Sequence, residues 1–87
     1  MAGDDASPLV QRRRLRAELR AARLKKGLTQ EQVARAMEWS LSKMNRIEKA
    51  KTGISANDLK ALLPEYDITD KKQTEELLAL ARGAVEA

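Results

Sequence analysis

Residues 27–48 read GLTQEQVARAMEWSLSKMNRIE and contain two helix starts in close succession. Leu28-Thr29 followed by Gln32-Val33 has the form of a capping box with a hydrophobic staple, in which the threonine caps the helix and the glutamine returns a hydrogen bond. Trp39-Ser40 with Met44 gives the staple without the box. These two starts predict helices over Gln30–Met37 and Leu41–Ala50.

The connection between these two helices consists of only Glu38, Trp39 and Ser40. So short a connection makes the helices cross steeply instead of lying antiparallel, which is the arrangement of a helix-turn-helix. On the second helix, Met44 and Ile47 have the spacing of an inward face. The opposite face is polar and cationic and has no acidic member: Leu41, Ser42, Asn45, Arg46 and Lys49.

This outward face carries the side-chain chemistry that reads DNA bases in a major groove. Arg46 can donate to both O6 and N7 of guanine, and Asn45 can pair with the edge of adenine. Ser42 can bond to more than one base, and Leu41 can touch the methyl group of thymine. We therefore expect these four residues to read bases. The alternative that periodicity leaves open is a helix face that is merely solvated.

Three further helices are expected around this pair. Ser7-Pro8 predicts the start of the first, because serine caps well and proline loses nothing at the first helical position. Leu15 and Leu19 continue its apolar face, and Gly27 predicts its end after about Lys26. Towards the C-terminus, the sequence predicts a helix over Ala56–Leu63 that Pro64 ends or kinks, and a last helix from Asp70, with Gln73 as its capping partner, to Gly83.

The composition fits one small helical domain. The chain has 87 residues, lacks Phe and contains Trp and Tyr once each, which favours helices over strands. The fold class is therefore all-α, a compact five-helix bundle. We expect Trp39 and Tyr66 in its core. We place the domain at residues 8–83, with flexible ends at 1–7 and 84–87.

The absence of His and Cys removes most enzymatic functions. Without them the chain lacks the usual general base at neutral pH, a thiol nucleophile, the soft metal ligands and any disulfide. The paired acids Asp4-Asp5 and Glu75-Glu76 have no base or metal ligand beside them. We expect no enzymatic activity, no catalytic or metal-binding residue and no cofactor.

The charge is distributed unevenly along the chain. Residues 1–53 hold 13 Lys and Arg against 6 Asp and Glu, a net +7, while residues 54–87 hold 4 against 7, a net −3. A basic part joined to an acidic part suggests that one face meets a polyanion, and nucleic acid is the leading candidate. No segment has the form of a membrane span or a secretory signal, so we expect no membrane association and a cytoplasmic, nucleoid-associated location.

Further basic residues are candidates for contacts with DNA phosphates. The run Arg12, Arg13 and Arg14, followed by Arg16, could grip phosphates or enter a minor groove, and a solvated helix face is the alternative. Three lysines flank the predicted reading helix and are expected to position it on the backbone: Lys43, Lys49 and Lys51.

The segments Gly27–Ala34 and Trp39–Glu48 resemble the phage repressor and Cro-like (XRE-type) family of helix-turn-helix transcriptional regulators. The combination of Gly-Leu-Thr-Gln with Trp-Ser-x-Ser-Lys-x-x-Arg-Ile-Glu is similar, more narrowly, to the actinobacterial branch of that family. The resemblance covers about Val10 to Arg82. It implies sequence-specific binding of double-stranded DNA, with repression more expected than activation, and a homodimer on a palindromic operator.

The resemblance also implies roles for individual residues. Gln30 matches a glutamine that meets a DNA phosphate and braces the recognition helix. Ser40 matches a position at the major groove and is expected to contact a phosphate. Arg23 and Glu48 match a structural ion pair between the first and third helices. The family commonly has Gly where this chain has Glu38, so the turn is expected to be re-formed.

Two matters of assembly stay open. The last helix is a candidate dimer face through Leu77, Leu80 and Val85, although the same leucines could belong to the core. The alternative to DNA binding is a protein-interaction module, such as an antitoxin or accessory regulator, that holds a partner through its acidic C-terminal half. The sequence also leaves open whether the chain stands alone or is the DNA-binding part of a longer protein.

Overall fold

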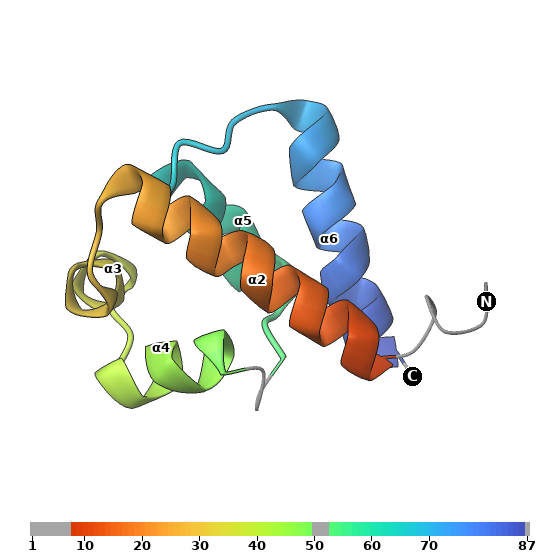
Figure 1. Cartoon of the computed structure of the whole chain (residues 1–87), viewed down its shortest axis with the longest axis horizontal. Helices are drawn as coiled ribbons and strands as arrows, with labels where there is room; N and C mark the ends of the chain where they lie inside the picture. Colours follow the sequence, from red (N-terminus) through yellow and green to blue (C-terminus); the bar gives the residue numbers. More distant parts are fainter. Residues whose placement is uncertain (1–7, 50–52, 87) are drawn as a thin grey trace.

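The computed structural model describes residues 8–49 and 53–86. Within these ranges the chain forms five helices and no strand, which confirms the prediction of an all-α fold (Figure 1). The helices are α2 (Pro8–Lys26), α3 (Gln30–Met37), α4 (Leu41–Glu48), α5 (Ala56–Glu65) and α6 (Lys71–Glu86).

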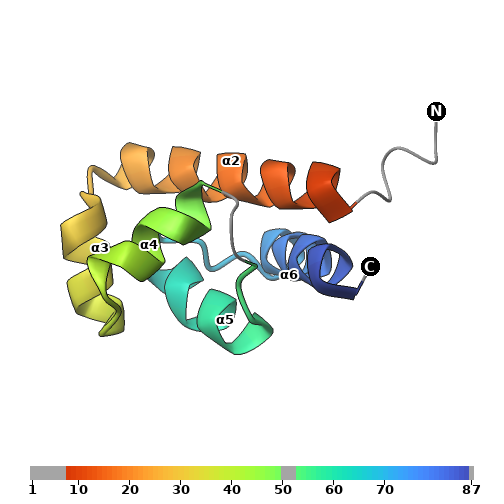
Figure 2. The same cartoon turned by 90° about the horizontal axis from the view of Figure 1, so that it is seen from below.

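The long helix α2 crosses α6 and also contacts α4. Figure 1 shows that the start of α2 lies near the end of α6, whereas α3 follows at the opposite end of α2. Figure 2 shows α2 and α5 on opposite sides of the molecule, with α4 and α6 between them. In this arrangement α4 lies at an edge of the bundle, where one of its faces meets the core and the other is left open.

In the described residues, the core is built from seven leucines and eight other apolar residues, which lie in the five helices and in the α4–α5 and α5–α6 connections. Its buried members are Leu15, Leu19, Val33, Ala34, Met44, Ile47, Ile54, Leu59, Leu62, Leu63, Tyr66, Ile68, Leu77, Leu78 and Ala81. Met44 and Ile47 therefore face inward as predicted. Tyr66 is buried in the core as expected, whereas Trp39 is only half-buried and packs against the core from outside.

The structure decides between the two alternatives that the sequence left open for Leu77. Leu77 is only 3% exposed and packs inside the core, so it is not available to a second copy of the chain. Leu80 is half-buried against the same core. The side chain of Val85 lies outside the described residues.

Four helix starts follow the predicted caps, and Ser7, the expected cap of α2, lies outside the described residues. Thr29 accepts a hydrogen bond from the Gln32 backbone at 3.1 Å and its own backbone N–H donates to the Gln32 side chain at 2.9 Å, which is the full capping box. Ser40 caps α4 and Ser55 caps α5 through the same kind of bond. Asp70 accepts from the Gln73 backbone at 2.8 Å at the start of α6.

The turn between α3 and α4 differs from its expectation. Glu38 adopts the left-handed conformation, with φ 58° and ψ 38°, so the turn keeps its form without glycine. Its N–H bonds to the Arg35 carbonyl and the next N–H, of Trp39, bonds to the Ala34 carbonyl. These two bonds satisfy the last carbonyls of α3 and hold the glutamate in place despite the strain.

Three helix ends lie away from their predicted positions. α4 ends at Glu48, and Ala50, where we expected its end, lies outside the described residues. α5 continues through Pro64 to Glu65, so proline sits in its last turn and removes only one hydrogen bond. α6 continues through Gly83 to Glu86, because a single glycine in a helix costs only about 1 kcal/mol relative to alanine.

Candidate nucleic-acid interface

The outward face of α4 forms a shallow depression with the start of α3. Its lining is the set of four predicted base-reading residues together with Gln30: Leu41, Ser42, Asn45 and Arg46. Leu41, Ser42 and Arg46 are exposed, and Asn45 is half-buried. Because Met44 and Ile47 anchor the opposite side of the helix in the core, these four side chains are presented on a fixed support.

Gln30 connects the start of α3 to α4. Its side-chain Nε2 donates to Oε1 of Glu48 at 2.9 Å, and its Oε1 accepts from Nδ2 of Asn45 at 3.4 Å. The sequence placed Gln30 and Asn45 on the same interface but gave no sign of a bond between them. This contact depends on how α3 and α4 cross, which only the folded structure defines.

Beneath this face, Arg23 and Glu48 form a buried ion pair with two hydrogen bonds. Arg23 Nε lies 2.6 Å from Glu48 Oε2, and Nη2 lies 2.9 Å from Oε1. The third nitrogen, Nη1, donates to the Leu28 carbonyl at 2.8 Å. The pair thus joins α2, the end of α4 and the segment that leads into α3.

Both members of the pair are charged at neutral pH. Burial alone would raise the pKa of Glu48, but the hydrogen bonds from Arg23 and Gln30 and the positive charge of Arg23 outweigh it and lower that pKa below its usual value. The same hydrogen bond raises the pKa of Arg23 above its usual value, against the opposite effect of burial. Glu48 is therefore a carboxylate with acceptors only.

The predicted phosphate-binding residues have different surroundings. Lys43 donates to Asp58 Oδ2 at 3.1 Å and lies 4.7 Å from the centre of the Trp39 ring, so it is tied to α5 as well as to the interface. Lys49 is exposed just after α4. The hydroxyl of Ser40 caps α4 by accepting from the Lys43 backbone. Lys51 lies outside the described residues.

The arginines near the start of α2 divide between two faces of the helix. Arg13 and Arg14 are exposed. Arg12 and Arg16 are half-buried beside Ile47, and their Nε atoms are buried with no hydrogen-bond partner in the described part of the chain. Arg12 and Arg16, which are four positions apart, thus lie on the packed face of α2, and Arg13 and Arg14 lie on its exposed face. Contact of these arginines with DNA phosphates stays a prediction.

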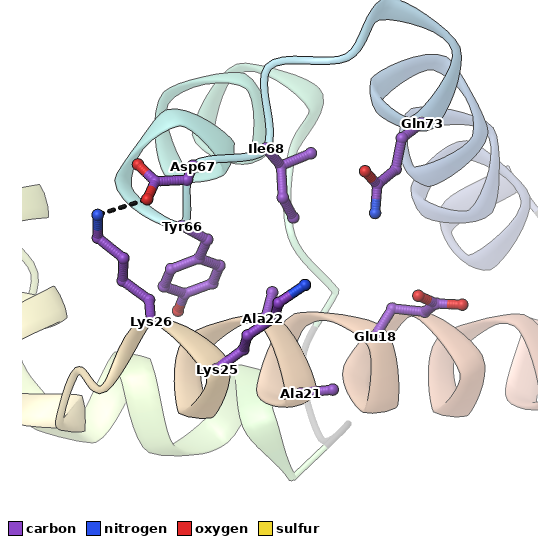
Figure 3. Close-up of a pocket in the computed structure, with 9 residues that line it drawn as sticks. All are labelled: Glu18, Ala21, Ala22, Lys25, Lys26, Tyr66, Asp67, Ile68 and Gln73. Atoms are coloured by element: carbon purple, nitrogen blue, oxygen red, sulfur yellow. Dashed lines mark hydrogen bonds and ion pairs between the residues drawn. The ribbon is translucent and has the colours of Figure 1, made fainter.

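A second depression lies between α2 and the connection from α5 to α6, and in Figure 1 this connection is on the other side of α2 from α4. Its volume is about 400 Å³. Figure 3 shows its lining, with Ala22 and Ile68 near the Tyr66 ring, and with the ion pair between Lys26 and Asp67 at one end. Sequence analysis missed it, because it is made by segments far apart in the chain. The depression is lined by both acidic and basic side chains, so its charge does not indicate a particular class of ligand.

Two other kinds of site are absent from the described residues. Residues 8–49 and 53–86 contain no group of three or more acidic side chains that could hold a metal ion. In the same part of the chain, no helix is long and apolar enough to cross a membrane.

The comparison with protein families decides the type of domain. A family model described as a helix-turn-helix domain matches residues 14–77, which include α3, α4 and the turn between them. The chain belongs to the helix-turn-helix domain family. No curated protein and no solved structure gives a significant match. For this helix-turn-helix protein, family membership indicates DNA binding.

Proposed function

We propose that this protein is a sequence-specific regulator of transcription that places α4 in the major groove of double-stranded DNA. The observation that carries the proposal is the depression lined by Leu41, Ser42, Asn45 and Arg46. Side chains that can donate, accept and make apolar contacts are gathered on one exposed face, which is the combination that distinguishes base pairs. A merely solvated helix has no need of such a set on an edge of the bundle.

The phosphate contacts surround this face. Gln30 and Ser40 stand at the starts of α3 and α4, where free backbone N–H groups and the helix dipole favour an anion. Lys49 and Lys43 flank α4, and Lys51 follows it in the sequence. Arg13 and Arg14 extend the basic surface along α2. The net +7 of residues 1–53 supports binding to a polyanion.

The biological role is proposed in the same terms. The motif over residues 27–48 supports membership of the phage repressor and Cro-like group, in its actinobacterial branch, and repression rather than activation. Such a regulator acts in the cytoplasm on the nucleoid. The resemblance to this group also supports a homodimer on a palindromic operator, with half-sites about one helical turn apart.

The proposal is tested by selecting binders from a pool of randomised DNA duplexes with the full chain at about 0.15 M salt. The expected result is a recurring motif of a few base pairs, enriched over several rounds. A pool that remains random after selection would contradict sequence-specific binding, and a partner for the acidic C-terminal half would then be the next candidate.

A further inference from the structure

The amide of Gln30 lies between a buried charge and the outward face of α4. An amide has nearly the same shape when its oxygen and nitrogen are exchanged, so its neighbours decide which way it is turned. Glu48 can only accept hydrogen bonds, and Arg23 keeps it ionised. Gln30 must therefore turn its NH₂ group towards Glu48, as the 2.9 Å contact shows, and its oxygen away.

The same reasoning extends to Asn45. The Gln30 oxygen is an acceptor, so Asn45 must offer it the NH₂ group, and Nδ2 lies 3.4 Å from that oxygen. These contacts form a chain of hydrogen bonds from Glu48 through Gln30 to Asn45, and the Asn45 side-chain oxygen is left at its outer end. The Asn45 side chain is half-buried and lines the outward depression. Among residues 8–49 and 53–86, the structure shows no hydrogen bond to this oxygen. The direction of each bond is thus set by the carboxylate at the buried end.

We propose that the Arg23–Glu48 pair, acting through Gln30, fixes Asn45 with its oxygen towards the DNA, so that Asn45 selects adenine or cytosine on the strand it faces. In the major groove, adenine N6 and cytosine N4 are donors, whereas guanine O6 and thymine O4 are acceptors. An oxygen held against O6 or O4 leaves two acceptors without a donor, which is unfavourable in a desolvated contact. Asn45 touches the base, and Gln30 and Glu48 are positioning residues.

This inference rests on the proposed function but makes a separate claim. An asparagine without the Gln30 contact can rotate its amide by half a turn and offer either a donor or an acceptor. Such a residue does not distinguish amino-bearing from keto-bearing bases. The arrangement in this chain converts a residue that could read either group into a reader of amino groups.

The test begins with a duplex selected from a randomised pool by the full chain. The base pair that faces Asn45 is found as the position whose preference disappears in Asn45→Ala. At that position, we expect the unsubstituted chain to bind duplexes with adenine or cytosine on the facing strand about tenfold more tightly than duplexes with guanine or thymine. A base analogue that lacks only the exocyclic amino group should lose binding to a similar extent.

The positioning role is tested by Gln30→Met, which keeps the length of the side chain and removes its hydrogen bonds. The preference for amino over keto bases should fall from about tenfold towards onefold, because the Asn45 amide is free to turn. Loss of a phosphate contact weakens binding to all sequences alike, so the ratio separates the two effects. Gln73→Met is the matched control, because Gln73 is exposed on α6 and, among the described residues, only its backbone N–H is bonded, so its ratio should not change.

A second variant keeps the test informative if Gln30→Met alters α3. In Gln30→Met combined with Asn45→Asp, the carboxylate offers only acceptors whichever way it turns, so the preference for an amino-bearing base should return.

The outcomes separate the two claims. Equal binding of amino and keto bases by the unsubstituted chain, or a ratio that survives Gln30→Met, would overturn the inference and leave the proposed function standing. So would an Asn45→Ala variant whose preferences are unchanged at every position. Failure to select any duplex would overturn the proposed function and the inference together.

Discussion

At the scale of single residues, the Arg23–Glu48 pair joins three parts of the fold at one buried point. Resemblance in the sequence suggested the two partners, because they match an ion pair of related proteins. The individual hydrogen bonds of the pair and the link through Gln30 to Asn45 could not be predicted, because residues 23, 30, 45 and 48 meet only when α2, α3 and α4 are packed.

Removal of one partner should harm the fold more than removal of both. Arg23→Met leaves the Glu48 carboxylate buried without its counter-charge, and we expect the free energy of unfolding to fall by about 3–5 kcal/mol. The double variant Arg23→Met with Glu48→Leu leaves no buried charge and should lose much less. Urea denaturation of the two variants and the unsubstituted chain measures the difference. Equal losses in both would show that the pair is not the source of the effect.

The lowered pKa of Glu48 predicts a loss of stability in acid. Since this carboxyl group has a lower pKa when folded than its unfolded value of about 4.3, the unfolded chain takes up its proton first as the pH falls. The stabilisation is complete above that value and is lost as the pH falls through the folded pKa. Thermal unfolding between pH 6 and about pH 3 should therefore show a steeper loss for the unsubstituted chain than for Arg23→Met with Glu48→Leu, and parallel curves would contradict this.

At the scale of helices, the starts were predictable and the ends were less so. Thr29, Ser40, Ser55 and Asp70 cap their helices by contacts with residues three positions ahead, so the information is local. The ends depend on packing as well. α6 passes through Gly83 although glycine commonly ends a helix.

Substitutions at Gly27 and Glu38, which follow α2 and α3, should change stability in opposite directions. Both have positive φ, 80° and 58°. Glu38→Gly relieves about 1 kcal/mol of strain and should raise Tm by about 4–8 °C. Gly27→Ala should lower Tm to a similar extent, and because no atom lies within 4 Å of the added Cβ, the loss is conformational and not steric. Calorimetry measures both, and a fall in Tm for Glu38→Gly would show that this side chain makes a contact worth more than the strain.

At the scale of the whole molecule, the bundle presents α4 at an edge (Figure 2). The excess of basic residues lies in residues 1–53, the part of the chain that contains α2, α3 and α4. The amphipathic pattern of α4 predicted which side chains face outward, because the direction of a side chain on a helix depends only on its position within that helix. The depression between α2 and the α5–α6 connection was not predictable, since it is formed by packing between distant segments. The division of the α2 arginines between a packed and an exposed face also appears only in the assembled bundle.

The most direct test of the account measures dissociation constants for a selected duplex and a scrambled duplex across a salt series. The unsubstituted chain is compared with Arg46→Ala and Arg13→Ala, two exposed arginines on different helices. Arg46→Ala should lose about 1–3 kcal/mol on the selected duplex and most of the preference over the scrambled one. Arg13→Ala should weaken both duplexes equally and reduce the salt slope by about one. If both variants weaken both duplexes alike, α4 does not read sequence and the central claim is contradicted.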